Sequence, residues 1–426
     1  MAVADDAPQT SERSWPDLAA AFVRIGLLSF GGPAGQIALM HRVLVKERRW
    51  LSEERFLHAL NFCMLLPGPE AMQLATYSGW LLRGVAGGVL AGLLFVLPGF
   101  VIVLALSILY VTLGDVPVVA GLFLGLKAAV LAIVAEALAR VARKGLRVRW
   151  QAVVAASAFV AIALFGVPFP LVILLAALVG LWMAEPVRAE APSTPVSHAH
   201  VARTLGVWLS IWLLPALLTV ALVGSVWGRE AIFFSQAALV TFGGAYAVLA
   251  YVAQRAVEDF GWLAPGEMAT GLGLAESTPG PLILVLVFVG FLGGYRVDAS
   301  LWGGAFGALI TAWVTFAPCF LWIFLGAPYV ERLHTGGRAA SALAGVFAAV
   351  VGVIANLAVW FALRVLFGTV NETSLGPVTL WMPVPATFLP APLLIAGVAA
   401  FMLWRRVDVL WTLAVAAVLG VSVHWT

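Results

Sequence analysis

The stretch NFCMLLPGPEAMQLATYSGW, from Asn61 to Trp80, places proline, glycine and proline in the middle of an apolar run, and Glu70 follows at once. Proline has no backbone N–H to donate, and in a helix interior it costs about 3 kcal/mol or more. The run therefore predicts a helix that breaks in its middle and carries a carboxylate at the break.

Composition decides which solvent surrounds this chain. Its 426 residues are 62% hydrophobic and 11% charged, and the mean hydropathy is +1.03. A soluble domain carries about 25% charged residues, so this chain cannot cover a water-exposed surface. The apolar runs are about 20 residues long, as membrane helices require, and they do not alternate as barrel strands do. We therefore expect an all-α integral membrane protein that crosses the membrane many times and has lipids as partners.

The few charged residues and the cysteines exclude other classes. The net charge is +3, and Lys and Arg lie in short loops as the positive-inside rule predicts, so nucleic acid is not an expected partner. Cys63 and Cys319 form neither a disulfide framework nor a metal-binding pattern. No cofactor and no metal are expected.

The break at Pro67–Pro69 belongs to a duplicated pattern. LLSFGGPAG, starting at Leu27, matches LVTFGGAYA, starting at Leu239, and LLPGPE matches STPGPL. The matching positions are each 212 residues apart, and they pair Ser29 with Thr241, Trp50 with Trp262 and Pro67 with Pro279. This spacing predicts two homologous multi-span halves: a first repeat over 1–183, a linker with a connecting span over 184–229, and a second repeat over 230–426.

Charge predicts that the two halves are inverted repeats. Between the Phe-Gly-Gly and Pro-Gly-Pro motifs the first half is basic, whereas the second half, over 255–267, has one arginine against Glu258, Asp259 and Glu267. Opposite loop charge favours opposite orientation in the membrane. The count of apolar segments between basic loops further predicts that the Pro-Gly-Pro segment is broken or re-entrant, which is tolerated where protein or a water-filled cavity covers the backbone.

Broken helices point to anion binding. The helix that starts after a break presents unpaired N–H groups and about half a positive charge, and such ends bind anions. The alternative is structural, because glycine and proline are common in membrane helices and Gly-Gly can simply allow close packing. The candidate substrate-binding residues at or beside the breaks are Ser29, Gly31, Gly32, Asn61, Pro67, Gly68, Pro69, Thr241, Gly243, Gly244, Ser277, Thr278, Pro279 and Gly280.

Taken together, SFGGP, LLPGPEAMQLATYSGW and GLGLAESTPGPLI (Gly271 to Ile283) resemble the chromate ion transporter family in its long, two-domain form. The resemblance covers nearly the whole chain. It implies a permease of the bacterial cytoplasmic membrane that exports chromate and confers chromate resistance, with sulfate as a mimic or competitor, and halves of opposite orientation. The second half departs from the pattern, with Ala245 where the first half has Pro33, so the halves need not contribute equally.

Four ionisable residues in or beside the apolar runs are functional candidates, because charges in lipid are costly. Lys127 lies far from either end of its span and serves either the anion or a structural ion pair. Arg24 either faces the cavity or reaches the membrane interface. Glu70 and Glu276 flank the two Pro-Gly-Pro motifs and are either proton-coupling groups or ordinary helix caps.

The function expected from this pattern is a secondary transporter that works by alternating access at a midplane oxyanion site. Two alternatives remain: a permease or channel for sulfate or another oxyanion, and a membrane enzyme acting on lipid phosphates. The chain has no cluster of acid, base or metal-ligating residues that such an enzyme needs and no Walker A loop, so an enzyme is not expected. The oligomeric state is open, with a homodimer as one candidate.

Overall fold

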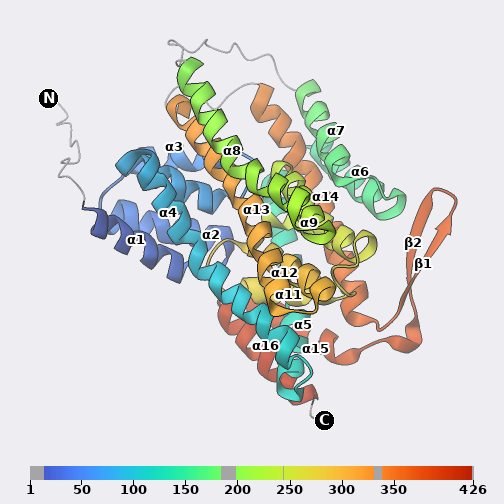
Figure 1. Cartoon of the computed structure of the whole chain (residues 1–426). Coiled ribbons are helices and arrows are strands. Elements are labelled where there is room, and N and C mark those ends of the chain that lie inside the picture. Colours follow the sequence, from blue (N-terminus) through green and yellow to red (C-terminus); the bar gives the residue numbers. More distant parts are fainter. Residues whose placement is uncertain (1–13, 184–197, 243, 331–337, 425–426) are drawn as a thin grey trace.

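The computed structural model describes residues 14–183, 198–242, 244–330 and 338–424. Helices dominate it (Figure 1). The helices before the linker are α1 (Trp15–Leu28), α2 (Gly32–His41), the π-helix η1 (Arg42–Glu47), α3 (Glu53–Cys63), α4 (Glu70–Leu113), α5 (Pro117–Gly145), α6 (Arg149–Phe165) and α7 (Phe169–Trp182). After the linker come α8 (His198–Leu222), α9 (Ser225–Leu239), α10 (Ala245–Gln254), η2 (Arg255–Asp259), α11 (Glu267–Glu276), η3 (Leu282–Leu284), α12 (Val285–Asp298), α13 (Leu301–Val330), α14 (Arg338–Leu366), β1 (Val370–Leu375), β2 (Val378–Pro383), η4 (Pro385–Thr387), α15 (Pro390–Trp404) and α16 (Val409–His424).

The order of elements in the first half recurs in the second. A helix ends before each Phe-Gly-Gly motif, a ten-residue helix runs into a π-helical turn, and another short helix ends before each Pro-Gly-Pro motif. The long helix α4 is interrupted at Arg83 and Gly84, where its backbone leaves helical geometry, and the turn between α12 and α13 stands at the matching place. The orientation of the halves in a membrane and the re-entrant character of the broken segments stay predictions.

The breaks form where glycine supplies a backbone conformation that other residues avoid. Gly68 and Gly280 have φ of 123° and 100°, and Gly31 and Gly244 have 81° and 100°. These positive values favour glycine because it has no Cβ. The prolines that follow Gly68 and Gly280 then cap the next helical segment without needing an N–H donor.

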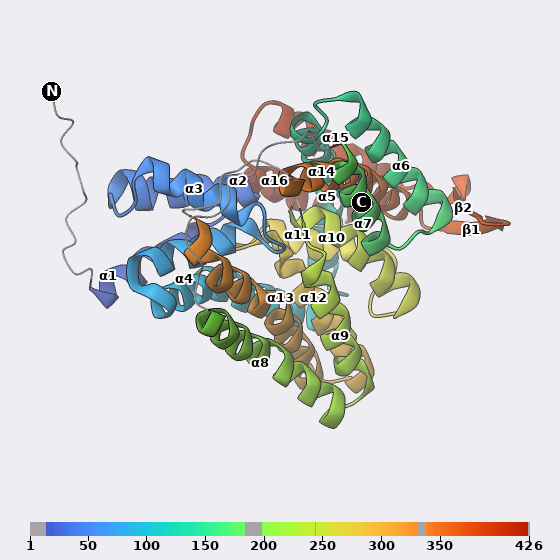
Figure 2. The same ribbon diagram turned by 90° about the horizontal axis from the view of Figure 1, so that it is seen from above.

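The protein is a multi-pass membrane protein. Among the described residues, five helices are long and apolar enough to cross a bilayer, namely α4, α5, α8, α13 and α14, and α6, α7, α15 and α16 are shorter apolar helices. The apolar run over 151–183 forms two short helices, because Gly166 ends α6 in a left-handed conformation. The all-α prediction was incomplete, since β1 and β2 pair as an antiparallel hairpin that projects from one side of the molecule in Figures 1 and 2.

The last two helices of each half pack against a helix of the other half. Helix α5 of the first half packs against α15 and α16, whereas α14 of the second half packs against α6 and α7. Figure 1 shows α5, α15 and α16 together near the C-terminus. Seen from above in Figure 2, α8, α9 and α13 lie along one face of the molecule.

Small residues allow this packing. A Cβ on Gly345 of α14 would lie 2.0 Å from the carbonyl oxygen of Ala176, and one on Gly125 of α5 would lie 2.0 Å from that of Ala416. Close helix approach through small residues spaced four apart is a common way to join membrane helices. One buried hydrophobic cluster therefore contains residues of both halves.

Candidate functional site

The four breaks meet in two reciprocal contacts between the halves. The amide of Gly68 donates to the carbonyl of Thr241 over 2.7 Å, and the amide of Gly280 donates to the carbonyl of Ser29 over 3.0 Å. Each Pro-Gly-Pro loop thus binds the residue that precedes the Phe-Gly-Gly motif of the other half. We call these four residues the crossing. Because the two contacts exchange equivalent positions, an approximate two-fold relation between the halves passes through the crossing.

Close approach at the crossing depends on small residues. A Cβ on Gly99 of α4 would lie 2.2 Å from the carbonyl oxygen of Pro279, so the second Pro-Gly-Pro loop touches the backbone of α4. A Cβ on Gly68 would lie 2.8 Å from Nε2 of Gln73 and 2.9 Å from Sγ of Cys319. The crossing is therefore packed tightly on its protein-facing side.

Two buried glutamines in the first half hold these loops. Nε2 of Gln36 donates to the carbonyl of Gly280 over 2.6 Å, and Nε2 of Gln73 donates to the carbonyl of Pro67 over 2.7 Å. Both Oε1 atoms lack a partner among the described residues. Gln36 was not predicted from the sequence, because one amide in a short helix carries no signal of its own, whereas Gln73 is a polar side chain in an apolar run.

The two Phe-Gly-Gly motifs border open space, in contrast to the tight Pro-Gly-Pro loops. A methyl group added to Gly31, Gly32 or Gly244 would have no described atom within 4 Å, apart from atoms of the glycine itself and of the residues next to it in the sequence. Helices α2 and α10 begin at these motifs, and no side chain caps either of them. The N–H groups in the first turn of a helix have no partner inside the helix. Gly243 lies outside the described residues.

The hydroxyl groups that were expected to donate to an oxyanion are engaged. Ser29 donates to the carbonyl of Ile25 and Thr241 to that of Ala237, and both side chains are fully buried. Ser277 and Thr278 likewise donate to carbonyls of α11. A hydroxyl has a single hydrogen to give, so these four groups would have to rotate before they could bind an anion. The backbone amides of Gly68 and Gly280 are engaged as well.

The two candidate coupling carboxylates differ in their surroundings. Glu276 is 5% exposed at the end of α11, and the hydroxyl of Tyr246, in the first turn of α10, donates to it. The ion pair of Arg140 with Glu136 on α5 acts on it through charge. Glu70 opens α4 directly after the crossing. The sequence reasoning missed Tyr246, although its place two residues after Gly244 puts it in the capping turn.

Lys127 lies at the opposite end of α11 from the crossing. A Cβ on Gly266, the residue before that helix, would be 2.6 Å from its Nζ, and the carboxylate of Glu267 is the charge that acts on it. Glu267 also accepts hydrogen bonds from Tyr110 and Arg296. The ten residues of α11 place Lys127 about 14 Å along the helix from Ser277.

Arg24 and Asn61 lie at the periphery. Arg24 pairs with Glu47 over 2.5 Å, and its side chain is 47% exposed. This hydrogen bond holds the pKa of the Glu47 carboxyl below its usual value. Asn61 is exposed on α3, one and a half turns before the Pro-Gly-Pro loop. The structure thus brings together the breaks and Glu276, but not Arg24, Asn61 or Lys127.

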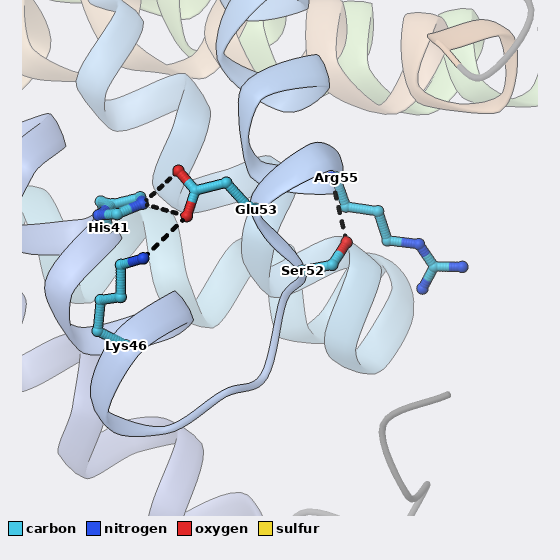
Figure 3. A network of polar contacts seen from close by, with 5 residues as sticks. All are labelled: His41, Lys46, Ser52, Glu53 and Arg55. Carbon is cyan, nitrogen blue, oxygen red and sulfur yellow. Dashed lines mark hydrogen bonds and ion pairs between the residues drawn. The ribbon is translucent and has the colours of Figure 1, made fainter. Parts of the chain in front are cut away.

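The loop between α2 and α3 holds a network of charged side chains (Figure 3). The carboxylate of Glu53 lies 2.8 Å from Nε2 of His41 and 3.2 Å from Nζ of Lys46. The hydrogen bond with His41, together with that from Lys46, holds the pKa of Glu53 below its usual value. Ser52 caps α3 by accepting from the amide of Arg55, and in Figure 3 the Arg55 side chain points away from the network. This cluster therefore fixes the loop at the surface.

Comparison with known proteins identifies the family. The profile of the chromate transporter family matches residues 16–181 and 228–421, which together span most of the chain. The chain belongs to the chromate transporter family. It is a transport protein rather than an enzyme, and the profile matches once in each half.

Relatives named as chromate transport proteins match most of the chain. The chromate transport protein of Pseudomonas aeruginosa is 37% identical over 348 residues, which cover 80% of this chain and 79% of that protein. The probable chromate transport protein of Synechococcus elongatus is 32% identical over 79% of this chain and 82% of its own. The chromate transport protein of Cupriavidus metallidurans is 29% identical over 89% of this chain and 90% of its own. No solved structure matches the chain.

Proposed function

We propose that this protein exports chromate across the bacterial cytoplasmic membrane as a secondary transporter, with the anion bound beside the crossing. The family and the names of the relatives support chromate as substrate. The observation that carries the site is the pair of uncapped helices α2 and α10, which both begin at glycines bordering open space. Two helix N-termini together offer about one positive charge, which suits a small dianion.

The proposed mechanism is alternating access around the crossing. The two reciprocal contacts hold each Pro-Gly-Pro loop against the opposite half, so a rocking motion of the halves would move both Phe-Gly-Gly motifs together. In this proposal the backbone at Gly31, Gly32 and Gly244 approaches the anion, which a side chain would prevent. Glu276 would couple this motion to proton movement through its hydrogen bond from Tyr246, and Glu70 is the second candidate.

Sulfate is the second candidate substrate. A site built from backbone N–H groups recognises the charge and the tetrahedral oxygens that chromate and sulfate share, so it gives little discrimination between them. Radiolabelled chromate flux in proteoliposomes, measured with increasing sulfate, shows which of the two anions the protein prefers. A transporter should also show faster chromate uptake when the proteoliposomes already contain chromate. Uptake that does not depend on internal chromate would instead indicate an anion channel.

A matched pair of glycine variants tests the location of the site. Gly32→Ala and Gly376→Ala impose similar backbone strain, because φ is 68° at Gly32 and 63° at Gly376 and neither added methyl meets a described atom within 4 Å. We expect Gly32→Ala to raise the chromate concentration needed for half-maximal flux, while Gly376→Ala, in the β1–β2 turn, leaves it unchanged. Equal effects of the two variants would remove the Phe-Gly-Gly motif from the binding site.

A further inference from the structure

A carboxylate outside the crossing has no visible partner. Glu230 lies in the second turn of α9 and is 0% exposed. Neither of its carboxylate oxygens has a hydrogen-bond partner among the residues that the structure describes. Carboxylates are almost never fully buried unless they are paired, so this side chain needs an explanation.

Glycines of two neighbouring helices make the space that Glu230 occupies. A Cβ on Gly293 of α12 would lie 2.4 Å from Oε1 of Glu230, and a Cβ on Gly307 of α13 would lie 3.0 Å from Oε2. The indole ring of Trp262 lies against the same face of Gly293. The carboxyl group is therefore enclosed between α9, α12 and α13 by backbone and an aromatic ring.

The charges near this enclosure do not neutralise Glu230. Arg229, its neighbour on α9, is exposed and acts on it only through charge. On α12, Arg296 is bound to Glu267 and to the carbonyl of Trp262, and Asp298 accepts from Ser300. Over 301–327, α13 carries no charged residue, and over 198–222 the charged residue of α8 is Arg203, near the other end of that helix.

The matching position in the first half shows that the fold does not require an acid there. Leu18 of α1 stands 212 residues before Glu230 and is also fully buried. Gly87 of α4 approaches Gly79 backbone to backbone, as Gly307 of α13 approaches Gly290, so both halves have a glycine at this helix contact. The second half has therefore exchanged a buried leucine for an acid.

The surroundings of Glu230 select the ligand. An unpaired ion in a protein interior costs several kcal/mol even after relaxation. A metal cation would need several oxygen ligands, whereas the Cα atoms of Gly293 and Gly307 and the indole of Trp262 face this carboxylate, and no second acidic, His or Cys side chain forms a metal-binding group with it among the described residues. A proton satisfies the group without further ligands. We propose that Glu230 binds a proton, and that its protonation governs the packing of α9 against α12 and α13 and so couples proton movement to anion transport.

Helix α9 connects this group to the crossing. Glu230 and Thr241 are 11 residues apart on α9 and its end, which is about 16 Å along a helix. The carbonyl of Thr241 accepts from Gly68, and the Phe-Gly-Gly motif before α10 follows directly. When Glu230 loses its proton, the charged group favours water, α9 loosens from the glycines, and the backbone at Thr241 moves with it.

This coupling rests on the proposed transport function, so two measurements separate them. The first is infrared difference spectroscopy of the purified protein during a pH titration, which reports the carbonyl stretch of a protonated carboxylic acid without any transport. We expect this band in the wild type and a loss of intensity from it in Glu230→Gln and in Glu230→Leu, the residue that the first half uses, while any contribution of Glu276 and Glu70 stays. The exposed acid Asp115 provides the control, since Asp115→Asn should keep the band.

The second measurement is chromate flux in proteoliposomes with and without a pH gradient at zero membrane potential. The wild type and Asp115→Asn should respond to the gradient, and flux through either Glu230 variant should be the same with and without it. A missing band in the wild type, an unchanged band in Glu230→Gln, or a wild-type response to the gradient in that variant would overturn the proposal. Absence of all chromate flux in the wild type would instead refute the transport function, while the infrared band still decides whether Glu230 holds a proton.

Discussion

Gly68→Ala tests whether the crossing is as tightly packed as its contacts indicate. The added Cβ would lie 2.8 Å from Nε2 of Gln73 and 2.9 Å from Sγ of Cys319. The backbone would also keep a φ of 123°, which alanine rarely adopts. Two separate penalties therefore act at one residue. The contacts with Gln73 and Cys319 can each be removed by changing a second side chain, whereas the backbone strain cannot.

The two penalties have different sizes and can be separated. A sparsely populated backbone conformation costs about 1–3 kcal/mol, and an overpacked core typically costs a further 1–3 kcal/mol or so. We therefore expect Gly68→Ala to lower the free energy of unfolding by about 2–6 kcal/mol. Cys319→Ala alone should cost about 1 kcal/mol, as small cavities do. In the double variant the clash with sulfur is gone, while the contact with Gln73 and the backbone strain remain, so the two changes should couple by about 0.5–3 kcal/mol.

The assay is a double-mutant cycle on the purified protein, with unfolding followed by circular dichroism as SDS is added to mixed micelles. Gly280→Ala provides the matched cycle, because its φ is also positive but its nearest atoms belong to Leu284, Gly99 and Phe95. We expect Gly280→Ala and Cys319→Ala to add within about 0.5 kcal/mol. Additive costs for the first pair as well, or a stable Gly68→Ala, would refute the close packing of this loop on α13.

Three further predictions concern the helix contacts, Lys127 and the surface loop. Gly345→Leu would place a Cβ 2.0 Å from a backbone oxygen of α7 and should abolish a monodisperse peak in size-exclusion chromatography, whereas Gly397→Leu, which meets open space, should not. Lys127→Met should weaken chromate binding about thirtyfold, because a unit charge about 14 Å away contributes roughly 1 kcal/mol per anion charge, or about 2 kcal/mol for a dianion, at an effective dielectric constant near 20; unchanged affinity would make Lys127 a structural residue. The pKa of Glu53 is lowered by its hydrogen bond with His41, so its contribution to stability is present above its ordinary pKa and is lost as the pH falls through the lower folded value. Glu53→Gln should therefore flatten the acid side of a melting-temperature profile, and an unchanged profile would show that this network contributes nothing measurable.

The helical architecture was readable from the sequence because it depends on local signals. Apolar runs, proline and glycine act within one helix, so the break at Pro67–Pro69 appears where it was expected. The packing of the terminal helices against the other half was not readable. It depends on backbone contacts such as that of Gly345 with α7, and a small residue in a membrane helix looks the same whichever helix it meets.

The candidate site was predictable at the level of motifs but not of individual donors. A repeat shows that Ser29 and Thr241 are equivalent, yet it does not show that their carbonyls accept from the opposite Pro-Gly-Pro loops. Their hydroxyls were expected to face an anion and instead donate along their own helices. Side-chain hydroxyls in helices often bond to the carbonyl four residues earlier, so a serine or threonine beside a break is a weak signal for a ligand.

The contrast between the two motifs assigns them different tasks. The amides of Gly68 and Gly280 donate hydrogen bonds to the opposite half, so the Pro-Gly-Pro loops connect the two halves. The Phe-Gly-Gly motifs keep uncapped helix ends beside open space, so they are the part suited to a ligand. In the proposed mechanism, neither half would change its contacts with the anion without moving the other, because each Pro-Gly-Pro loop contacts the residue before the Phe-Gly-Gly motif of the opposite half. Protonation of Glu230, an acid that the first half replaces with Leu18, could then change the positions of both halves.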